Sequence, residues 1–201
     1  MRTLVAVGAL SMLVFGSAQQ AVARSHALEP SRRHANALFL KHAVVGAHAA
    51  RPTGARSALR ALEFDIVARI NAQRAARGMR PLRVSRGLTA AASYHSNQMG
   101  ALGFFEHESR NGAPFWKRIQ RFYPAHRGYW SVGENIFWEA PDTTAGSAVQ
   151  EWMASAPHRQ NILGREWREV GIGAVHVPNA PGAFGGRPVT IVTADFGVRA
   201  G

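Results

Sequence analysis

The chain has 201 residues, of which 46% are hydrophobic, and it contains no cysteine. This composition suits one domain with its own core and excludes an intrinsically disordered chain, a disulfide framework and any cysteine-based zinc site or nucleophile. The formal net charge is +12. No recognition helix, zinc finger or RNA-binding aromatic motif accompanies this charge, so we expect no specific nucleic-acid binding. A solvated basic surface is favoured, with anionic envelope polymers or lipid as the partners that it would attract.

The first 23 residues have the pattern of a signal peptide. Arg2 gives a positive start, Leu4–Phe15 form an apolar segment, and Ala21-Val22-Ala23 is a small-x-small cleavage site. The apolar segment is shorter than the roughly 20 residues that a membrane-spanning helix needs, and an uncleaved anchor is the alternative. We therefore expect a mature chain that begins near Arg24 and a protein that is secreted or lies in the periplasm or cell envelope.

Residues 24–57 are rich in Ala, Arg and His, which indicates a basic linker. Apolar patches such as Ala37–Leu40 are too few for a core, and Pro30 and Pro52 interrupt any regular element. We expect this linker to be disordered and dispensable for folding. The domain itself is expected over residues 58–201, and we expect it to be a monomer.

Two amphipathic helices are expected at the start of this domain. The first is capped by Ser57 and ends at Gly78, and its apolar stripe consists of Leu59, Leu62, Ile66 and Ile70. The second begins after Ser85 and stops at Gly103, with a stripe of Leu88, Ala91, His95, Met99 and Leu102. Because His95 is on the apolar side of its helix, we interpret it as a core histidine whose ring is hydrogen-bonded.

Loops and short elements alternate in the middle of the chain. Loops are expected over residues 104–112 and 124–131, with a short helix from Pro114 to Phe122 between them. The apolar residues Ile136–Trp138 predict a short strand. A further helix is then expected, with a stripe of Val149, Trp152, Met153 and Ala156.

The boundaries of that last helix decide where one histidine lies. Asp142 or Thr143 is expected to cap its start, and Pro157 is expected to break it. His158 would therefore lie where the chain turns.

The end of the chain changes to strand periodicity. Two β-branched runs, 170–177 and 188–196, flank a turn rich in Pro and Gly, which predicts an antiparallel hairpin. Gly171 and Gly173 indicate that a helix packs closely on one face of this hairpin. Helices followed by an antiparallel hairpin predict an α+β layered domain.

Three residues are the candidates for a functional site. Glu134 follows Gly133 and enters an apolar run, and a buried carboxylate needs a partner. Candidate partners are found on both sides of Glu134 in the chain, His107 before it and His158 after it. Our hypothesis is that Glu134, His107 and His158 converge in one cleft, for acid/base chemistry or as joint ligands of zinc or another divalent metal. The sequence has neither a His-Glu-x-x-His zinc signature nor a Gly-x-Ser-x-Gly nucleophile elbow.

Several motifs agree in order and spacing with one known family. They are Phe105-x-His107, Gly133-Glu134-Asn135-Ile136, Trp152-Met153-x-Ser155-x-Pro157-His158-Arg159-x-Asn161-Ile162-Leu163 and Glu169-Val170-Gly171-Ile172-Gly173. From about residue 63 to 198 the sequence resembles the bacterial branch of the CAP superfamily. This superfamily is named after cysteine-rich secretory proteins, antigen 5 and pathogenesis-related 1 proteins, and its domain is also called SCP.

The resemblance implies a fold and a site. The fold would be an α-β-α sandwich, with a small, mostly antiparallel sheet between helical layers and an additional strand that the periodicity indicates only weakly. Many members have a cavity of two His and two Glu that holds zinc in some of them. His107 and His158 match the histidines and Glu134 matches one glutamate, but Ser155 stands at the second glutamate position. Asp195 stands where relatives often have Gln and is a further carboxylate.

The resemblance leaves three functions open, because function depends on the site rather than the fold. The first is an exported binding module of the cell envelope or extracellular space, whose His/Glu cleft is able to hold a divalent metal. The second is a peptidase-like hydrolase in which Glu134 activates a water with the help of His107 and His158 or a metal. The third is a carrier of lipid or sterol. We favour the first and keep the hydrolase as the main alternative.

Overall fold

The protein's computed structural model describes residues 53–125 and 128–199. The expected signal peptide and the linker up to residue 52 lie outside the described residues. The described part has five α-helices, a 3-10 helix and four strands: α1 (Thr53–Ala75), β1 (Arg83–Val84), α2 (Arg86–Leu102), α3 (Phe115–Phe122), β2 (Trp130–Glu139), α4 (Ala145–Ala154), α5 (Ala156–Ile162), β3 (Glu169–Ala180), η1 (Gly182–Phe184) and β4 (Arg187–Arg199).

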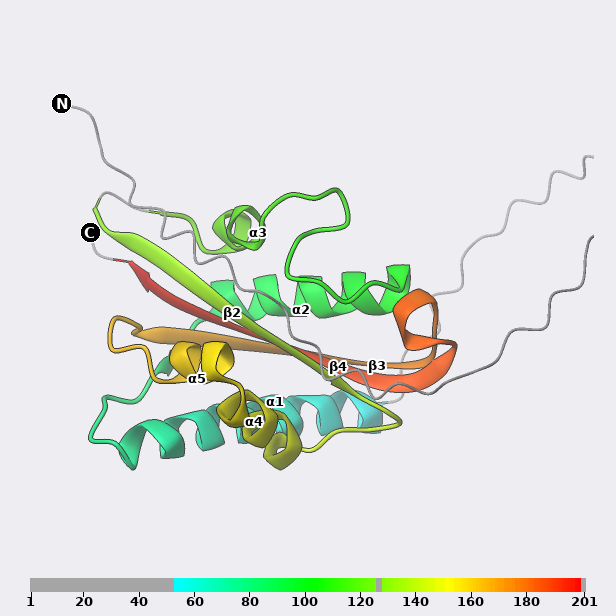
Figure 1. The fold of residues 1–201 in the computed structure, drawn as a ribbon, viewed down its shortest axis with the longest axis horizontal. Coiled ribbons are helices and arrows are strands. Elements are labelled where there is room, and N and C mark those ends of the chain that lie inside the picture. Colours follow the sequence, from blue (N-terminus) through cyan, green and yellow to red (C-terminus); the bar gives the residue numbers. More distant parts are fainter. Residues whose placement is uncertain (1–52, 126–127, 200–201) are drawn as a thin grey trace, which may run out of the picture. The chain divides into compact units, whose positions relative to one another are not determined.

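The four strands form one mixed sheet in the order β1-β3-β4-β2. β3 and β4 form the expected antiparallel hairpin, and β2 pairs with β4 in antiparallel orientation. The two-residue β1 runs parallel to β3 and is not among the strands that the sequence predicts. α2 and α3 cover one face of the sheet, and α1, α4 and α5 cover the other (Figure 1). The α+β class and the α-β-α sandwich are confirmed.

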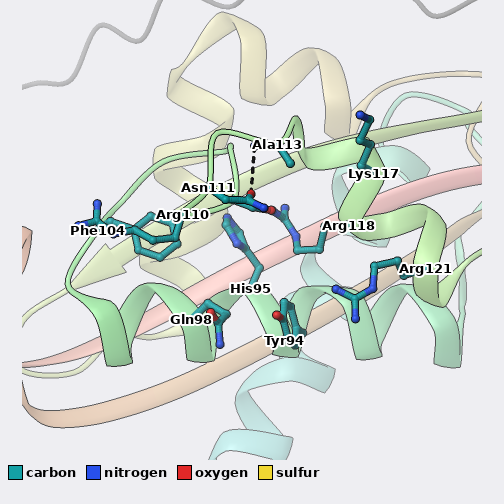
Figure 2. A pocket seen from close by; sticks show the side chains of 11 residues that line it. Tyr94, His95, Gln98, Phe104, Arg110, Asn111, Ala113, Lys117, Arg118 and Arg121 are labelled. Atoms are coloured by element: carbon teal, nitrogen blue, oxygen red, sulfur yellow. Dashed lines mark hydrogen bonds between the residues drawn. The ribbon is translucent and has the colours of Figure 1, made fainter.

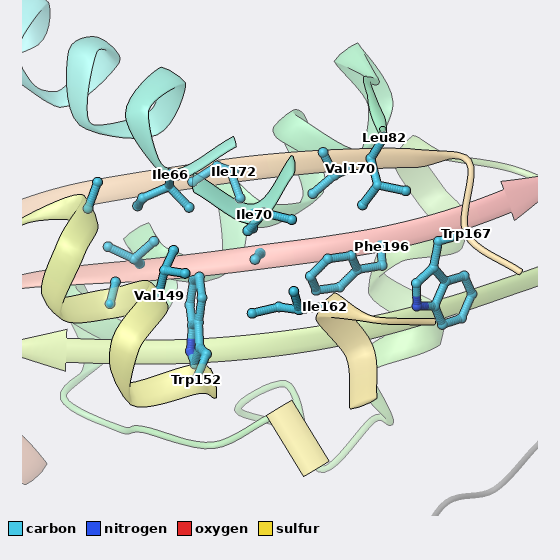
Figure 3. Close-up of a cluster of buried hydrophobic side chains, with 14 residues drawn as sticks. Ile66, Ile70, Leu82, Val149, Trp152, Ile162, Trp167, Val170, Ile172 and Phe196 are labelled. Carbon is cyan, nitrogen blue, oxygen red and sulfur yellow. The ribbon is translucent and has the colours of Figure 1, made fainter. Parts of the chain in front are cut away.

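The largest hydrophobic cluster fills the layer between the sheet and helices α1, α4 and α5 (Figure 3). Its buried members are Ile66, Ile70, Leu82, Ala145, Ala148, Val149, Trp152, Ile162, Trp167, Val170, Ile172, Val192, Ala194 and Phe196. Burial of one such Val, Leu, Ile or Phe side chain contributes roughly 1.5–3 kcal/mol. The indole of Trp152 also donates a hydrogen bond of 3.1 Å to the carbonyl oxygen of Ile136, which ties α4 to β2.

Two glycines of β3 let α2 lie directly on the sheet. A Cβ atom at Gly171 would overlap the backbone of Leu88 and Thr89, and a Cβ at Gly173 would overlap the backbone of Ser93. The close helix packing predicted from these two glycines is confirmed. It brings the buried face of α2, including His95, against the sheet.

The start of the first helix and its expected cap differ from the prediction. α1 begins at Thr53, so Ser57 lies inside the helix and does not cap it. The apolar stripe that predicted this helix begins only where the helix contacts the core. The exposed first turns of α1 contain no apolar periodicity, so the sequence pattern does not reveal them. In α2 the cap positions Ser85 and Gly103 are confirmed, but Leu102 is 48% exposed and does not belong to the buried stripe.

Two further corrections concern the surroundings of the candidate site. Thr144, and neither Asp142 nor Thr143, caps α4, and its hydroxyl accepts a 3.0 Å hydrogen bond from the backbone N–H of Ser147. Pro157 lies in the first turn of α5, where proline is well tolerated, so it begins a helix. His158 is consequently a helical residue and does not lie at a turn.

Candidate functional site

Glu134 lies in the middle of β2, a ten-residue strand rather than the short one expected over Ile136–Trp138. Successive side chains of a strand point to opposite faces. The carboxylate of Glu134 points toward α2 and α3, where its partners are. Asn135 points to the other face, where its amide donates a 3.0 Å hydrogen bond to the carbonyl oxygen of His158 in α5.

The neighbours of Glu134 in the chain explain the motif around it. The side-chain amide of Asn161 donates to the backbone carbonyl of Glu134 at 3.0 Å and to Oδ1 of Asn135 at 2.8 Å. Gly133 leaves room for Asn161, because a Cβ atom at Gly133 would lie 2.9 Å from its Oδ1. The Gly-Glu-Asn sequence of β2 and the His-to-Asn sequence of α5 therefore lock these two elements together.

Both oxygens of the Glu134 carboxylate are engaged. Nδ1 of His107 donates to Oε1 over 2.9 Å, and Nη2 of Arg118 forms an ion pair with Oε2. The side chain of Glu134 has no exposed surface, and the residue Arg118 is only 3% exposed. The second guanidinium nitrogen of Arg118 donates to the backbone carbonyl of His107 at 3.1 Å. One arginine of α3 therefore holds both the strand and the loop that carries His107.

The charge of Glu134 is set by these contacts. Burial alone would raise its pKa, but the charge of Arg118 and the hydrogen bond from His107 outweigh burial and lower the pKa to about 2. Asp195, also fully buried, is the cross-strand neighbour of Glu134 on β4. Burial and the negative charge of Glu134 raise the pKa of Asp195 well above its ordinary value. Glu134 is therefore ionised at neutral pH, whereas the pKa of Asp195 is shifted in favour of its protonated form.

His95 lies against this pair from α2. Its Nε2 is 2.9 Å from the backbone carbonyl oxygen of Glu106 and 4.0 Å from Oε1 of Glu134. Burial lowers its pKa to about 4, although the charge of Glu134 opposes this shift. His95 is consequently neutral at pH 7 and donates from Nε2 to Glu106. Its interpretation as a hydrogen-bonded core histidine is confirmed.

The structure joins two of the three predicted site residues directly. Glu134 and His107 share a hydrogen bond, and the His107 side chain is 21% exposed. His158 belongs to α5, which packs on the face of the sheet opposite α2. Burial, and next to it the charge of His107, lower the pKa of His158 to about 4, so the two histidines are electrostatic neighbours. In the described part of the chain, the His158 ring forms no hydrogen bond or ion pair with Glu134 or His107.

This arrangement does not fit a metal held jointly by His107, His158 and Glu134. Within residues 53–125 and 128–199, no three His, Cys, Asp or Glu side chains are grouped so that they could hold a metal ion. Both Glu134 oxygens already have partners, and one partner is the cation of Arg118, which repels a divalent metal.

Arg118 is the residue of this site that the sequence analysis missed. It precedes Ile119, and these two are the buried residues of the short helix α3. The available signal was physical rather than a motif, because a buried Glu134 carboxylate needs a cation as its partner. From the sequence, Asp195 is identified only as a further carboxylate. An acid within the apolar run 192–196 indicates a buried group that is either protonated or paired.

A pocket of about 380 Å³ lies beside this cluster, between α2, α3 and the loop of residues 104–113 (Figure 2). We call it the basic pocket. Its lining residues are Tyr94, His95, Gln98, Phe104, Ser109, Arg110, Asn111, Ala113, Lys117, Arg118 and Arg121. Four of them are Lys or Arg and none is an acid. His95 and Arg118 belong both to the pocket wall and to the surroundings of Glu134, so the pocket and the buried cluster adjoin.

Solved structures with the same fold come from bacterial surface and extracellular proteins. An extracellular protein of Bacillus anthracis that contains an SCP domain aligns with a TM-score of 0.60 and 22% identity, over 75% of this chain and 44% of that one. An outer surface protein of Borrelia burgdorferi aligns with a TM-score of 0.53 and 15% identity, over 67% of this chain and 90% of that one. At these identities the likeness concerns the fold alone. No helix in the described part of this chain is long and apolar enough to cross a membrane.

Sequence comparison shows the family. The uncharacterized protein YkwD of Bacillus subtilis is 32% identical over 124 residues, which cover 61% of this chain and 46% of YkwD. The chain thus spans less than half the length of this relative and of the Bacillus anthracis protein. Residues 67–196 match the model of the CAP family, described as the cysteine-rich secretory protein family. The chain therefore belongs to the bacterial members of the CAP superfamily, with an SCP domain that contains no cysteine.

Proposed function

We propose that this chain is an exported protein that acts as a binding module outside the cytoplasm, in the cell envelope or the extracellular space. Its N-terminal 23 residues have the pattern of a signal peptide. The Bacillus anthracis relative is described as extracellular and the Borrelia burgdorferi relative as an outer surface protein, which supports the same location here. Recovery of the protein outside the cytoplasm with Arg24 as its first residue, read by mass spectrometry, would support this placement; an intact residue 1–23 segment would contradict the cleavage.

The single observation that favours binding over catalysis is the state of Glu134. A general base works best when its pKa lies near the operating pH and when it reaches the water that it activates. Glu134 instead has a lowered pKa, no exposed surface, and a partner on each oxygen. Its contacts fasten α3 and the His107 loop to the sheet. The cluster therefore serves as the rigid wall of a binding pocket.

The hydrolase and the lipid carrier are less well supported by the same geometry. A hydrolase would need Glu134 to leave Arg118 before it could take a proton from water. A carrier of an apolar ligand would need an apolar cavity, whereas Arg or Lys supplies four of the side chains of the basic pocket. An anionic ligand fits this pocket better.

The test compares binding with turnover on the same sample. The full-length chain is incubated with isolated bacterial cell envelopes and with a mixed peptide library, and both retention and cleavage products are measured. We expect retention on the envelopes and no cleavage that depends on the site. Turnover that disappears in His158→Gln and in Glu134→Gln, but persists in the control His176→Gln outside the site, would contradict the proposal and establish the hydrolase.

A further inference from the structure

We propose that the basic pocket is a binding site for a small, hydroxyl-bearing anion, held through a phosphate or carboxylate group. This inference rests on the proposed binding function and names the ligand class of its pocket. The pocket is lined by Arg110, Lys117, Arg118 and Arg121, without an acid. Guanidinium groups match phosphate and carboxylate oxygens with paired hydrogen bonds, which makes these groups the ligands that such a wall selects.

Three of the four cations are free to meet a ligand. Arg118 is neutralised by Glu134. Among residues 53–125 and 128–199, Arg110, Lys117 and Arg121 form no ion pair with a carboxylate, although each is exposed at the pocket. An anion that enters the pocket would be attracted by these three exposed, unpaired cations.

Aromatic rings contact all three of these cations, including the ammonium of Lys117, which lies 5.7 Å from the centre of the Trp116 ring. The guanidinium of Arg110 lies over the Phe104 ring at 6.0 Å, and that of Arg121 lies over the Tyr94 ring at 5.7 Å. Figure 2 shows Arg110 beside Phe104 at one end of the pocket and Arg121 at the other, with Arg118 between them. Cations that are positioned before binding lose less side-chain freedom when the ligand arrives, and this favours affinity.

The size and polarity of the pocket define the rest of the ligand. A volume of about 380 Å³ is at the lower end of the range for small-molecule sites. Gln98, Ser109 and Asn111 line the same cavity and offer amide and hydroxyl groups. Together with the cations they suit a sugar-sized molecule that carries hydroxyls and one anionic group, free or at the end of a polymer.

Isothermal titration of the full-length chain at low salt tests this site. The probes are glucose 6-phosphate, glucuronate and neutral glucose. We expect saturable binding of at least one of the two anions and none of glucose; the stronger anion identifies phosphate or carboxylate as the preferred group. If neither anion binds, or if glucose binds equally well, the inference is wrong.

A matched pair of variants separates the pocket from overall charge. Lys117→Gln/Arg121→Gln removes two exposed cations of the pocket, and Arg56→Gln/Arg60→Gln removes two exposed cations of α1 on the opposite side of the sheet. We expect the pocket variant to bind about tenfold or more weakly, since a charge-assisted hydrogen bond contributes that much, and the α1 variant to bind within about twofold of the wild type. Equal losses in both variants, or a loss in neither, would overturn the inference.

The two proposals fail separately. Absence of anion binding together with retention on envelopes leaves the binding module intact and moves its contact surface away from the basic pocket. Turnover that requires Glu134 and His158 contradicts the binding module, whatever the anion titration shows.

Discussion

Glu134 on β2 and Asp195 on β4 stand directly opposite each other, so two buried carboxyl groups occupy one position of the sheet, the first with a lowered pKa and the second with a raised pKa. Arg118 decides which group is ionised, because its guanidinium contacts Glu134. Two ionised carboxylates at paired positions of neighbouring strands would repel each other strongly, because both residues are buried. The pKa values of the two acids are therefore shifted in opposite directions, and this difference determines how the domain responds to pH and to substitution.

Asp195→Asn is expected to leave stability at neutral pH unchanged or higher. A folded-state pKa above the unfolded value means that Asp195 stabilises the fold at low pH and loses this contribution as pH rises through the folded pKa. An amide is neutral at every pH and removes this loss. Urea unfolding across the range from acid to alkaline pH measures the difference, with the exposed Asp65→Asn on α1 as the control. A variant that loses stability relative to wild type as pH rises would show that Asp195 is ionised in the fold.

Glu134→Gln and Arg118→Met are each expected to destabilise the domain by about 3–5 kcal/mol, because each leaves the other charge buried without its partner. The double variant is expected to lose less than the sum of the two, since no buried charge is left uncompensated. The wild type, the two single variants and the double variant are unfolded with urea. Their free energies of unfolding give the interaction energy between Glu134 and Arg118. Additive losses would mean that the two residues do not stabilise the fold as a pair.

The sequence predicted most of the elements around this site. The stripes of α1 and α2, the hairpin β3–β4 and the packing role of Gly171 follow from periodicity and sterics, and these are local signals. Family motifs matched Glu134 and His107. Arg118 could not be found this way, because only the tertiary packing of α3 turns a charged residue of a short helix inward. The prediction that His158 lies at a turn was wrong because Pro157 is compatible with both the end and the start of a helix.

The stability of the domain is expected to fall as pH drops from about 6.5 to about 4. His95 and His158 both have folded-state pKa values of about 4, below the ordinary 6.5, so the unfolded chain takes up these protons first. Removal of one such histidine should reduce the slope by up to about 1.4 kcal/mol per pH unit. His158→Gln tests this, and His176→Gln outside the site is the control. An unchanged slope in His158→Gln would show that His158 is not held neutral by the fold.

Zinc is expected to leave the cleft unaffected. A metal bound by the folded state alone would raise stability by about 2.7 kcal/mol at a hundredfold excess over its Kd. Because Glu134 is paired with Arg118 and His107, the melting temperature at neutral pH should respond to zinc to the same extent in the wild type and in His107→Ala/His158→Ala. Any zinc binding by the histidines of residues 24–57 is the same in both proteins, so it does not contribute to the difference between them. A zinc shift that disappears in the double variant would restore the predicted metal site.

The most direct measurement of the central claim is the titration of the Glu134 carboxyl carbon by ¹³C NMR in the full-length chain, from about pH 8 to about pH 3. The contacts with Arg118 and His107 predict that Glu134 stays ionised throughout, because its pKa is lowered to about 2. An inflection near neutral pH, as a general base requires, would contradict the account and return Glu134 to the role of a catalytic acid or base.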